Sequence, residues 1–261
     1  MTNPHGSFIW YELMSPDPAG SKVFYDAVVG WDIEPEPAGE MDYRMIRRAD
    51  GGNSGGVMRL TDEMRGHGAR PMWLGYVGVD DVDRAVTAVE QRGGSVLMPA
   101  HDMPGVGRFA MVTDPGHIPF YVIKPTPPPG AEGQASDVFS PDQPQRVGWN
   151  ELSSRDPDGA VHFYGQLFGW VNKENMAMGE AGDYRFLDHH HLRIGALRGV
   201  TPGGSAGWRY YVRVPSIAAA IEAVKAGGGS VDVGPHEVPG GDHIISGIDP
   251  QGARFALVGG Q

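Results

Sequence analysis

Cysteine is absent from this chain of 261 residues, which excludes disulfides, thiolate metal ligands and a cysteine nucleophile. Positive charge is also scarce, because the formal net charge is -11 at pH 7 and no run of Lys or Arg occurs. That balance disfavours nucleic acid as a partner, since phosphate-binding proteins present basic surfaces. No stretch approaches the roughly 18 consecutive apolar residues of a membrane span, and residues 1–6 do not resemble a secretion signal. We therefore expect a cytoplasmic protein with neither membrane nor nucleic acid as partner.

The second half of the sequence repeats the first half. Trp10 and Glu12 recur with the same spacing as Trp149 and Glu151. The repeat continues through Asp17-Pro18 and Asp156-Pro157, Phe24-Tyr25 and Phe163-Tyr164, Gly30-Trp31 and Gly169-Trp170, Trp73 and Trp208, Tyr76 and Tyr211, His101 and His236, and Asp114-Pro115 and Asp249-Pro250. A proline-rich segment that cannot build a core separates the copies. We predict a first domain over residues 1–125, an extended linker over 126–145 and a second domain over 146–261.

Each half predicts strands and helices in the same order. Residues 8–14 are rich in aromatic and β-branched side chains, as strands are. Asp17 is a good helix N-cap before Pro18, and the helix that follows stops at Gly30. Later strand signals lie at 43–46, 56–60 and 73–79, and a second helix carries Val82, Val86 and Val89 before Gly93-Gly94. Each half therefore contains two strand–helix–strand–strand–strand (βαβββ) modules, and the chain contains four modules of α+β class.

A set of short motifs accompanies these modules, nearly all of them present twice. They are Asp17-Pro18, Phe24-Tyr25, Gly30-Trp31, residues 79–82, Gly93-Gly94 and Asp114-Pro115-Gly116. In their order and spacing these motifs resemble the vicinal-oxygen-chelate superfamily, which comprises glyoxalases, bleomycin-resistance proteins and dioxygenases. The likeness covers nearly the full chain. Within the superfamily, the chain most resembles the two-domain glyoxalase-like proteins. It implies tandem glyoxalase-like domains in which four modules form cup-shaped mixed sheets.

The resemblance also implies positions for metal ligands, because metal-dependent members place His, Gln or acidic side chains on four strands of each cup. Those positions fall on Trp10 and Trp149, residues 56–58 and 195–197, Leu74 and Arg209, and Tyr121 and Ala256. Apart from a tyrosinate, none of these side chains ligates a divalent metal ion. The Gly-rich stretches also lack the strand, Gly-x-Gly-x-x-Gly and helix order of a dinucleotide site. We therefore predict neither metal nor cofactor.

Glu12 and Glu151 are the candidates for catalysis. Each lies two residues after the repeated tryptophan, so strand alternation places both side chains of a pair on one face. The family comparison makes this the concave face of the cup. A carboxylate there could act as a general base or as a hydrogen-bond anchor for a ligand. In the alternative interpretation, each glutamate pairs with an arginine such as Arg44 or Arg185 and fixes strand geometry.

Aromatic and histidine side chains complete the predicted ligand site. Asp42-Tyr43-Arg44 recurs as Asp183-Tyr184-Arg185, with Tyr and Arg on opposite faces of a strand. The residues expected to bind ligand are Trp10, Tyr43, Trp73, Tyr76, His101 and Phe120 in the first half, and Trp149, Tyr184, Trp208, Tyr211, His236 and Phe255 in the second. Each aromatic could instead be ordinary core, and both histidines are expected in a loop. A metal site built from His189, His191 and Glu151 is a weaker alternative.

These observations predict a metal-independent protein that binds a small organic molecule in aromatic-lined cups. The alternative is an enzyme of the same superfamily, a lyase, isomerase or oxygenase of the hydroxylase type, that uses Glu12 and Glu151 or an off-pattern metal site. A third interpretation, an interaction protein, applies if side chains fill the cups. Because the fused copies supply both modules of a cup, the sequence is compatible with a monomer or a homodimer.

Overall fold

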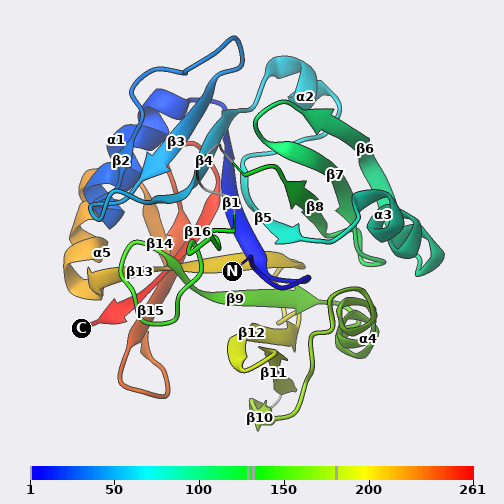
Figure 1. The fold of residues 1–261 in the computed structure, drawn as a ribbon. Coiled ribbons are helices and arrows are strands. Elements are labelled where there is room, and N and C mark those ends of the chain that lie inside the picture. Colours follow the sequence, from blue (N-terminus) through cyan, green and yellow to red (C-terminus); the bar gives the residue numbers. More distant parts are fainter. Residues whose placement is uncertain (1, 128–129, 131–132, 180–181) are drawn as a thin grey trace. The chain divides into compact units, whose positions relative to one another are not determined.

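The computed structural model describes residues 2–127, 130, 133–179 and 182–261, which form four βαβββ modules (Figure 1). The first module comprises β1 (Phe8–Ser15), α1 (Pro18–Val29), β2 (Asp32–Ile33), β3 (Tyr43–Arg47) and β4 (Asn53–Arg59), followed by the short helix α2 (Asp62–Gly66). The second comprises β5 (Met72–Gly78), α3 (Val82–Gln91), β6 (Ser95–Met103), β7 (Gly107–Thr113) and β8 (Pro119–Pro125). The third comprises β9 (Val147–Ser154), α4 (Pro157–Phe168), β10 (Asn175–Ala177), β11 (Asp183–His189) and β12 (Leu192–Gly199). The fourth comprises β13 (Gly207–Ser216), α5 (Ile217–Ala226), β14 (Ser230–Glu237), β15 (His243–Ile248) and β16 (Arg254–Gly260).

The strands form two eight-stranded mixed sheets, one from each half of the sequence. Their strand orders are β2-β3-β4-β1-β5-β8-β7-β6 and β10-β11-β12-β9-β13-β16-β15-β14. Within a module the first strand pairs in parallel with the last, as β1 does with β4 and β13 with β16, and the hairpin strands pair antiparallel. The two orders are the same once the second is renumbered. The predicted α+β fold of four modules with mixed sheets is therefore confirmed.

The helix ends follow from their capping residues. The Asp17 carboxylate accepts a hydrogen bond from the Gly20 backbone N–H at 3.0 Å, and Pro18 occupies the first turn of α1. At the other end Gly30 adopts a left-handed backbone with φ 79°, which costs glycine little. Asp156 caps α4 through Gly159 in the same way. The repeated Asp-Pro and Gly-Trp motifs are thus the start and stop signals of the first helix in each half.

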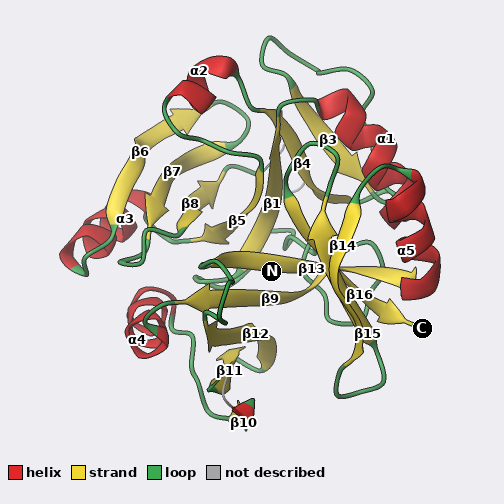
Figure 2. Cartoon of the chain, turned by 180° about the vertical axis from the view of Figure 1, so that it is seen from behind, coloured by secondary structure: helices red, strands yellow, loops and turns green. Residues whose placement is uncertain are grey.

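The modules group into two compact units that each combine one module from each half. Unit 1 contains residues 1–10, 75–136 and 150–208, and it holds most of the second and third modules. Unit 2 contains residues 11–74, 137–149 and 209–261, and it holds most of the first and fourth modules. In unit 2, α1 and α5 lie side by side (Figures 1 and 2). The domain boundaries expected at 126–145 describe the sequence repeat and stay a prediction; residues 128–129 and 131–132 of that linker lie outside the described residues.

Buried Tyr–Asp hydrogen bonds join the two modules of each unit. In unit 2 the Tyr25 hydroxyl donates to the Asp249 carboxylate at 2.8 Å, and in unit 1 the Tyr164 hydroxyl donates to Asp114 at 3.1 Å. Burial raises the pKa of both aspartates, and burial also raises the pKa of Tyr25 well above its ordinary value. The repeated Phe-Tyr and Asp-Pro motifs therefore meet across the halves, with each tyrosine bound to the aspartate of the other half.

Residues 137–149 are anchored to the first module within unit 2. The buried Arg48 guanidinium donates to both carboxylate oxygens of Asp137, at 3.0 and 2.8 Å, and Arg146 donates to Asp137 and Asp50 at 2.7 Å each. Gln145 adds four hydrogen bonds to the first module. Its backbone carbonyl accepts from the Trp31 indole at 2.9 Å and from the Ser54 hydroxyl, and its side chain bonds Gly30 and Ala49. The arginines lower the pKa of Asp137 despite its partial desolvation. The end of the linker is therefore held in unit 2 by hydrogen bonds and ion pairs.

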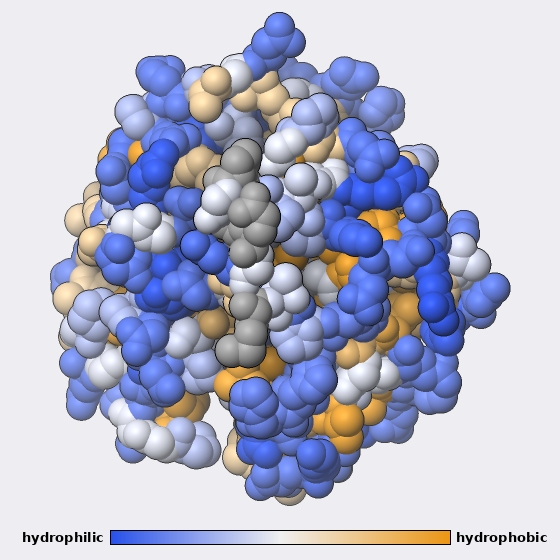
Figure 3. All heavy atoms as spheres, in the orientation of Figure 1, coloured by the Kyte–Doolittle hydropathy of each residue, from blue (hydrophilic) through white to orange (hydrophobic). Residues whose placement is uncertain are grey.

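Hydrophilic residues dominate the face of the molecule in Figure 3, as the net charge of -11 leads one to expect. Apolar residues appear there as smaller patches between hydrophilic ones. Across the described parts of the chain, no helix is long and apolar enough to cross a membrane.

Candidate ligand-binding site

A buried carboxylate–phenol pair marks the inner face of the third module, in unit 1. Glu151 on β9 is only 4% exposed, and the Tyr184 hydroxyl donates a hydrogen bond to its Oε2 at 2.9 Å. Tyr184 lies on β11, so its ring must reach across β12, where Ala196 is the register partner of Glu151. A small residue at Ala196 leaves room for that ring. The pair therefore places an oriented acid on the sheet face that the sequence predicted.

The first module repeats this arrangement in unit 2. Glu12 on β1 is 2% exposed and is the register partner of Gly56 on β4. The Tyr43 ring from β3 lies over Gly56 so closely that a Cβ there would come within 2.2 Å of the Tyr43 hydroxyl oxygen. Tyr43 thus reaches across β4 in the direction of β1, as Tyr184 reaches across β12. A side chain at position 56 would therefore displace the Tyr43 ring from the place it occupies here.

The strand register corrects one detail of the expected repeat. Glu12 is opposite Gly56, whereas Glu151 is opposite Ala196. The residues of β12 equivalent to 56–58 are therefore 196–198, one position later than the expected 195–197. Gly55 is then equivalent to Gly195, and both have φ 159°.

The repeated arginines bind other carboxylates. The Arg44 Nε donates to Asp42 at 2.9 Å, and the Arg185 Nη2 donates to Asp158 on α4 at 2.8 Å. Because Tyr184 contacts Glu151 while Arg185 contacts the helix, the two neighbours lie on opposite faces of β11, as predicted. The alternative in which Arg44 or Arg185 neutralises the glutamates is not what these contacts show.

Four aromatic rings gather on the inner face of the second module, also in unit 1. Tyr76 on β5 stacks on its register partner Tyr121 on β8, with ring centroids 4.1 Å apart and planes 12° apart. Phe109 on β7 packs edge-on to Tyr121 at 6.1 Å, and His101 lies 4.3 Å from Phe109. The sequence identified Tyr76 and His101 as ligand contacts but not Tyr121 and Phe109, whose strand alternation would have placed them on this face.

The fourth module has a different inner face, in unit 2. Tyr211 on β13 is the register partner of Ala256, at the position where the second module has Tyr121. Tyr211, Ala256 and Val258 form a buried cluster, and Trp149 packs against it. The stacked tyrosine pair of the second module is thus reduced to a tyrosine beside an alanine.

Four of the predicted ligand contacts lie on the opposite, helix-facing side of their strands. The Trp73 indole donates to the Tyr25 hydroxyl at 3.0 Å, and the Trp208 indole donates to Tyr164 at 3.2 Å. Phe120 packs on Tyr164 and Phe168, and Phe255 packs on Phe24. The expected cage of Trp73, Tyr76 and Phe120, and of Trp208, Tyr211 and Phe255, is therefore not assembled. Strand alternation explains this, because Trp73 and Phe120 are three and one residues from the inward-facing Tyr76 and Tyr121.

The histidines also differ from expectation. His101 lies within β6 and the exposed His236 lies within β14, not in loops. His189 is buried at the end of β11, where its Nε2 lies 3.0 Å from the His5 carbonyl oxygen, and burial lowers its pKa. His190 and His191 form the turn to β12. His189 therefore has a structural partner within unit 1.

The strand positions at which metal-dependent relatives carry ligands do not fit a divalent cation. Leu74 and Ala256 are buried apolar residues, and the Tyr121 ring is stacked on Tyr76. Trp10 and Trp149, on the first strands, offer no lone pair to a metal. Over the ranges that the structure describes, no group of three or more His, Asp or Glu residues could hold a metal ion.

The fold and these inner faces define the class of the protein. The family model of the Glyoxalase/Bleomycin resistance protein/Dioxygenase superfamily matches residues 7–122, and the chain belongs to this superfamily. Among its relatives, CFP32 of Mycobacterium tuberculosis, named as a glyoxylase candidate, is 30% identical over 257 residues, which cover 95% of this chain and 93% of that protein. The anthracycline biosynthesis protein DnrV of Streptomyces peucetius is 28% identical over 267 residues, covering 97% and 93%.

Solved structures share the fold at lower identity. The Mn(II)-bound glyoxalase from Novosphingobium aromaticivorans has a TM-score of 0.64 and 17% identity, covering 98% of this chain and 82% of that one. A mutant of homoprotocatechuate 2,3-dioxygenase from Brevibacterium fuscum has a TM-score of 0.64 and 17% identity, covering 98% and 72%.

Proposed function

We propose that this protein binds a small aromatic molecule with a hydroxyl or amine group, and that it does so without a metal ion. The site is the sheet face around Glu151 and Tyr184 in the third module, with its counterpart around Glu12 and Tyr43 in the first. The observation that carries the proposal is the buried Glu151–Tyr184 hydrogen bond. A buried carboxylate that a phenol holds in a fixed orientation is a strong acceptor, so it suits a ligand O–H or N–H.

Neighbouring rings support an aromatic ligand. On β11, Phe186 lies two residues after Tyr184, on the same strand face, with ring centroids 5.6 Å apart and planes nearly perpendicular. The Arg193 guanidinium covers the Phe186 ring at 4.3 Å. Binding sites for small molecules combine such apolar walls with a few placed polar groups. The name of DnrV, an anthracycline biosynthesis protein, agrees with an aromatic ligand.

Ligand screening with matched variants tests the proposal. A panel of phenols, catechols, naphthols and anilines would be screened by thermal shift, since a ligand that binds the folded state raises the melting temperature. Calorimetry on the best binder should show that Glu151→Gln and Tyr184→Phe each weaken binding about tenfold, or about 1.4 kcal/mol. Glu12→Gln and Tyr43→Phe test the other face in parallel. A panel without any binder, or an affinity in all four variants equal to that of the wild-type protein, would count against the proposal.

The alternative function is an enzyme in which Glu151 and Glu12 act as general bases. The same phenol–carboxylate geometry favours it, because the Tyr184 hydrogen bond fixes the orientation of the carboxylate that would accept a substrate proton. The glyoxalase and dioxygenase folds of the solved relatives agree with that alternative. Two measurements separate these functions. Stoichiometric iron, manganese, zinc or nickel that survives dialysis favours an enzyme with an off-pattern metal site. For metal-free protein, a product formed from the best binder and lost in Glu151→Gln favours the general-base enzyme, and unchanged ligand favours sequestration.

A further inference from the structure

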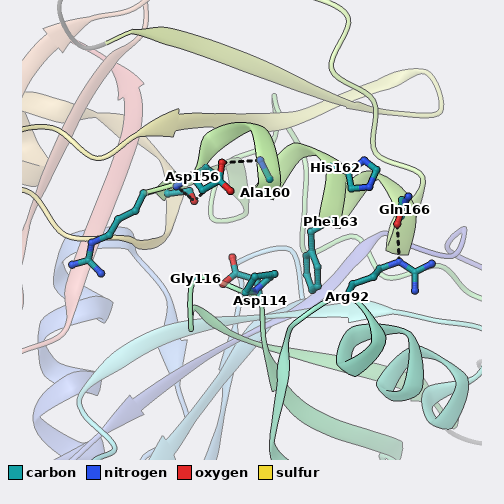
Figure 4. Close-up of a pocket in the computed structure, with 12 residues that line it drawn as sticks. Arg92, Asp114, Gly116, Asp156, Ala160, His162, Phe163 and Gln166 are labelled. Atoms are coloured by element: carbon teal, nitrogen blue, oxygen red, sulfur yellow. Dashed lines mark hydrogen bonds between the residues drawn. The ribbon is translucent and has the colours of Figure 1, made fainter.

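A cleft of about 500 Å³ lies within unit 1, on the helix side of the sheets and away from Glu151 (Figure 4). Its apolar lining is the exposed Pro115, with Phe163 and Ala160 behind it at 2% and 5% exposed. In the view of Figure 4 the Phe163 ring lies between Asp114 on the β7–β8 turn and Arg92 at the end of α3. The cleft is thus bounded by the last turn of α3, the first turns of α4 and the Asp-Pro-Gly turn.

The equivalent space in unit 2 is occupied. Gly116, in the turn that lines the cleft, corresponds to Gln251 in the fourth module. The Gln251 amide lies over the first turn of α1, where Ser21 Oγ donates to it at 3.5 Å and a Cβ on Gly20 would meet its nitrogen at 2.6 Å. In the same test on Gly159 of α4, the three nearest atoms all belong to the carboxylate of its own cap, Asp156. A glycine in place of this glutamine therefore leaves the cleft open.

The wall of the cleft at the end of α3 is also more open than its equivalent at the end of α5 in unit 2. In unit 2 the Phe24 ring packs onto Gly227 and Gly229, so that a Cβ on either would approach it within 2.9 Å. The residue equivalent to Gly227 in unit 1 is Arg92, whose side chain turns outward. Its Nε donates to Gln166 at 2.9 Å and its Nη1 to the Ala88 carbonyl at 3.0 Å. In unit 1 the Arg92 side chain at the edge of the cleft thus replaces the close contact of Gly227 with Phe24 in unit 2.

The charges of the cleft favour an anion. Arg92 and Arg155 both line it, and neither forms an ion pair with a carboxylate among the residues that the structure describes. The acidic residues of the lining already have partners: Asp114 accepts from Tyr164 and Ile118, and Asp156 caps α4 through Gly159. The cleft therefore combines two arginines with an apolar lining.

We propose that this cleft is a second binding site, specific to unit 1, for a small organic carboxylate with an apolar ring or chain. The Arg92 guanidinium binds the carboxylate through its remaining N–H groups, and Gln166 holds that guanidinium in place. The apolar body lies on Pro115, with Phe163 behind it. Unit 2 does not offer this site, because Gln251 and Phe24 fill its equivalent.

Titration with benzoate as the probe tests the site in the full-length protein. We expect benzoate to bind at least about tenfold more tightly than its neutral isostere benzamide, because the guanidinium recognises charge. Arg92→Gln should remove that preference. Gly116→Gln, which introduces the glutamine found at position 251, should abolish binding, and Gly116→Ala should retain it as a control for the turn.

Each outcome bears on the proposal. Benzoate binding that persists unchanged in Gly116→Gln, that does not exceed benzamide binding, or that is absent from the wild-type protein would overturn it. Loss of benzoate binding in Gly116→Gln, loss of the preference over benzamide in Arg92→Gln and retention of binding in Gly116→Ala together support it. Glu151→Gln and Tyr184→Phe should leave benzoate binding intact, so failure of this site is distinguishable from failure of the site on the inner sheet face.

Discussion

The two compact units are built from the same kinds of module, yet they differ where their helices meet. Both contain the buried Tyr–Asp bond, Tyr164 to Asp114 in unit 1 and Tyr25 to Asp249 in unit 2. Unit 2 adds a glutamine that closes the space beside this bond, whereas unit 1 has a glycine and a cleft. Residues kept in both copies therefore hold the architecture together, and residues that differ at matched positions indicate where the copies have separate tasks.

Removal of the buried aspartates should have the largest effect. Asp249 accepts hydrogen bonds from Tyr25, Gln251 and Ala253, while Asp114 accepts from Tyr164 and Ile118. Because each orphaned buried donor has a desolvation cost, we expect Asp249→Ala to lower the free energy of unfolding by about 4 kcal/mol and Asp114→Ala by about 3 kcal/mol.

Urea unfolding measures both values. Tyr25→Phe and Tyr164→Phe serve as controls and should cost about 1–2 kcal/mol, since the other hydrogen bonds of each aspartate survive. A loss below about 1 kcal/mol in either alanine variant would show that the Tyr–Asp bond does not join the modules.

The next largest loss of stability should follow removal of an arginine that binds Asp137 in unit 2. Arg48 is 5% exposed and binds Asp137, which is itself half-exposed, so we expect Arg48→Ala to cost about 2 kcal/mol rather than the full value of a buried pair. Arg108→Ala in unit 1 is the control, because its ion pairs with Asp83 and Asp102 are exposed and should matter little. Chemical denaturation of both variants checks this; equal losses would contradict it.

The pH dependence should have opposite signs at two aspartates of unit 2. Burial raises the pKa of Asp249 above 3.8, so its contribution is complete below that pH and is lost as pH rises through the folded-state pKa. Asp137 has a lowered pKa, so its contribution is present above 3.8 and is lost as pH falls.

Unfolding free energies of wild type, Asp249→Asn and Asp137→Asn between about pH 3 and 7 test these signs. The advantage of wild type over Asp249→Asn should shrink with rising pH, and its advantage over Asp137→Asn should grow. Parallel curves for the two variants would refute the assignment.

Removal of the Gln251 side chain from unit 2 should have the smallest effect. Gln251→Gly removes a long hydrogen bond to Ser21 and leaves the turn with the residue found in unit 1, so we expect a loss of about 0.5–1 kcal/mol. A melting curve and a crystal structure of the variant measure the cost and the space created. A loss above about 2 kcal/mol would contradict this expectation, because one long hydrogen bond does not account for so large a contribution of Gln251.

Much of the fold was predictable because its signals are local. Asp17 and Gly30 bound α1 as expected, and four modules follow from repeated caps and strand patterns. The candidate site was predictable only in part. Glu151 and Tyr184 were both identified, but their hydrogen bond was not. Phe120 and Phe255 were placed on the inner face although strand alternation puts each next to an inward-facing neighbour.

The sequence by itself determined the modules, their order and their caps, since those depend on residues a few positions apart. Only the tertiary structure decided that Tyr25 binds Asp249, 224 residues away, and that Tyr164 binds Asp114, 50 residues away. Both copies carry the same Tyr and Asp motifs, so the local pattern is equal for pairing within a half or across halves. The choice rests on how the helices pack, and the cleft beside Gly116 follows from the same packing.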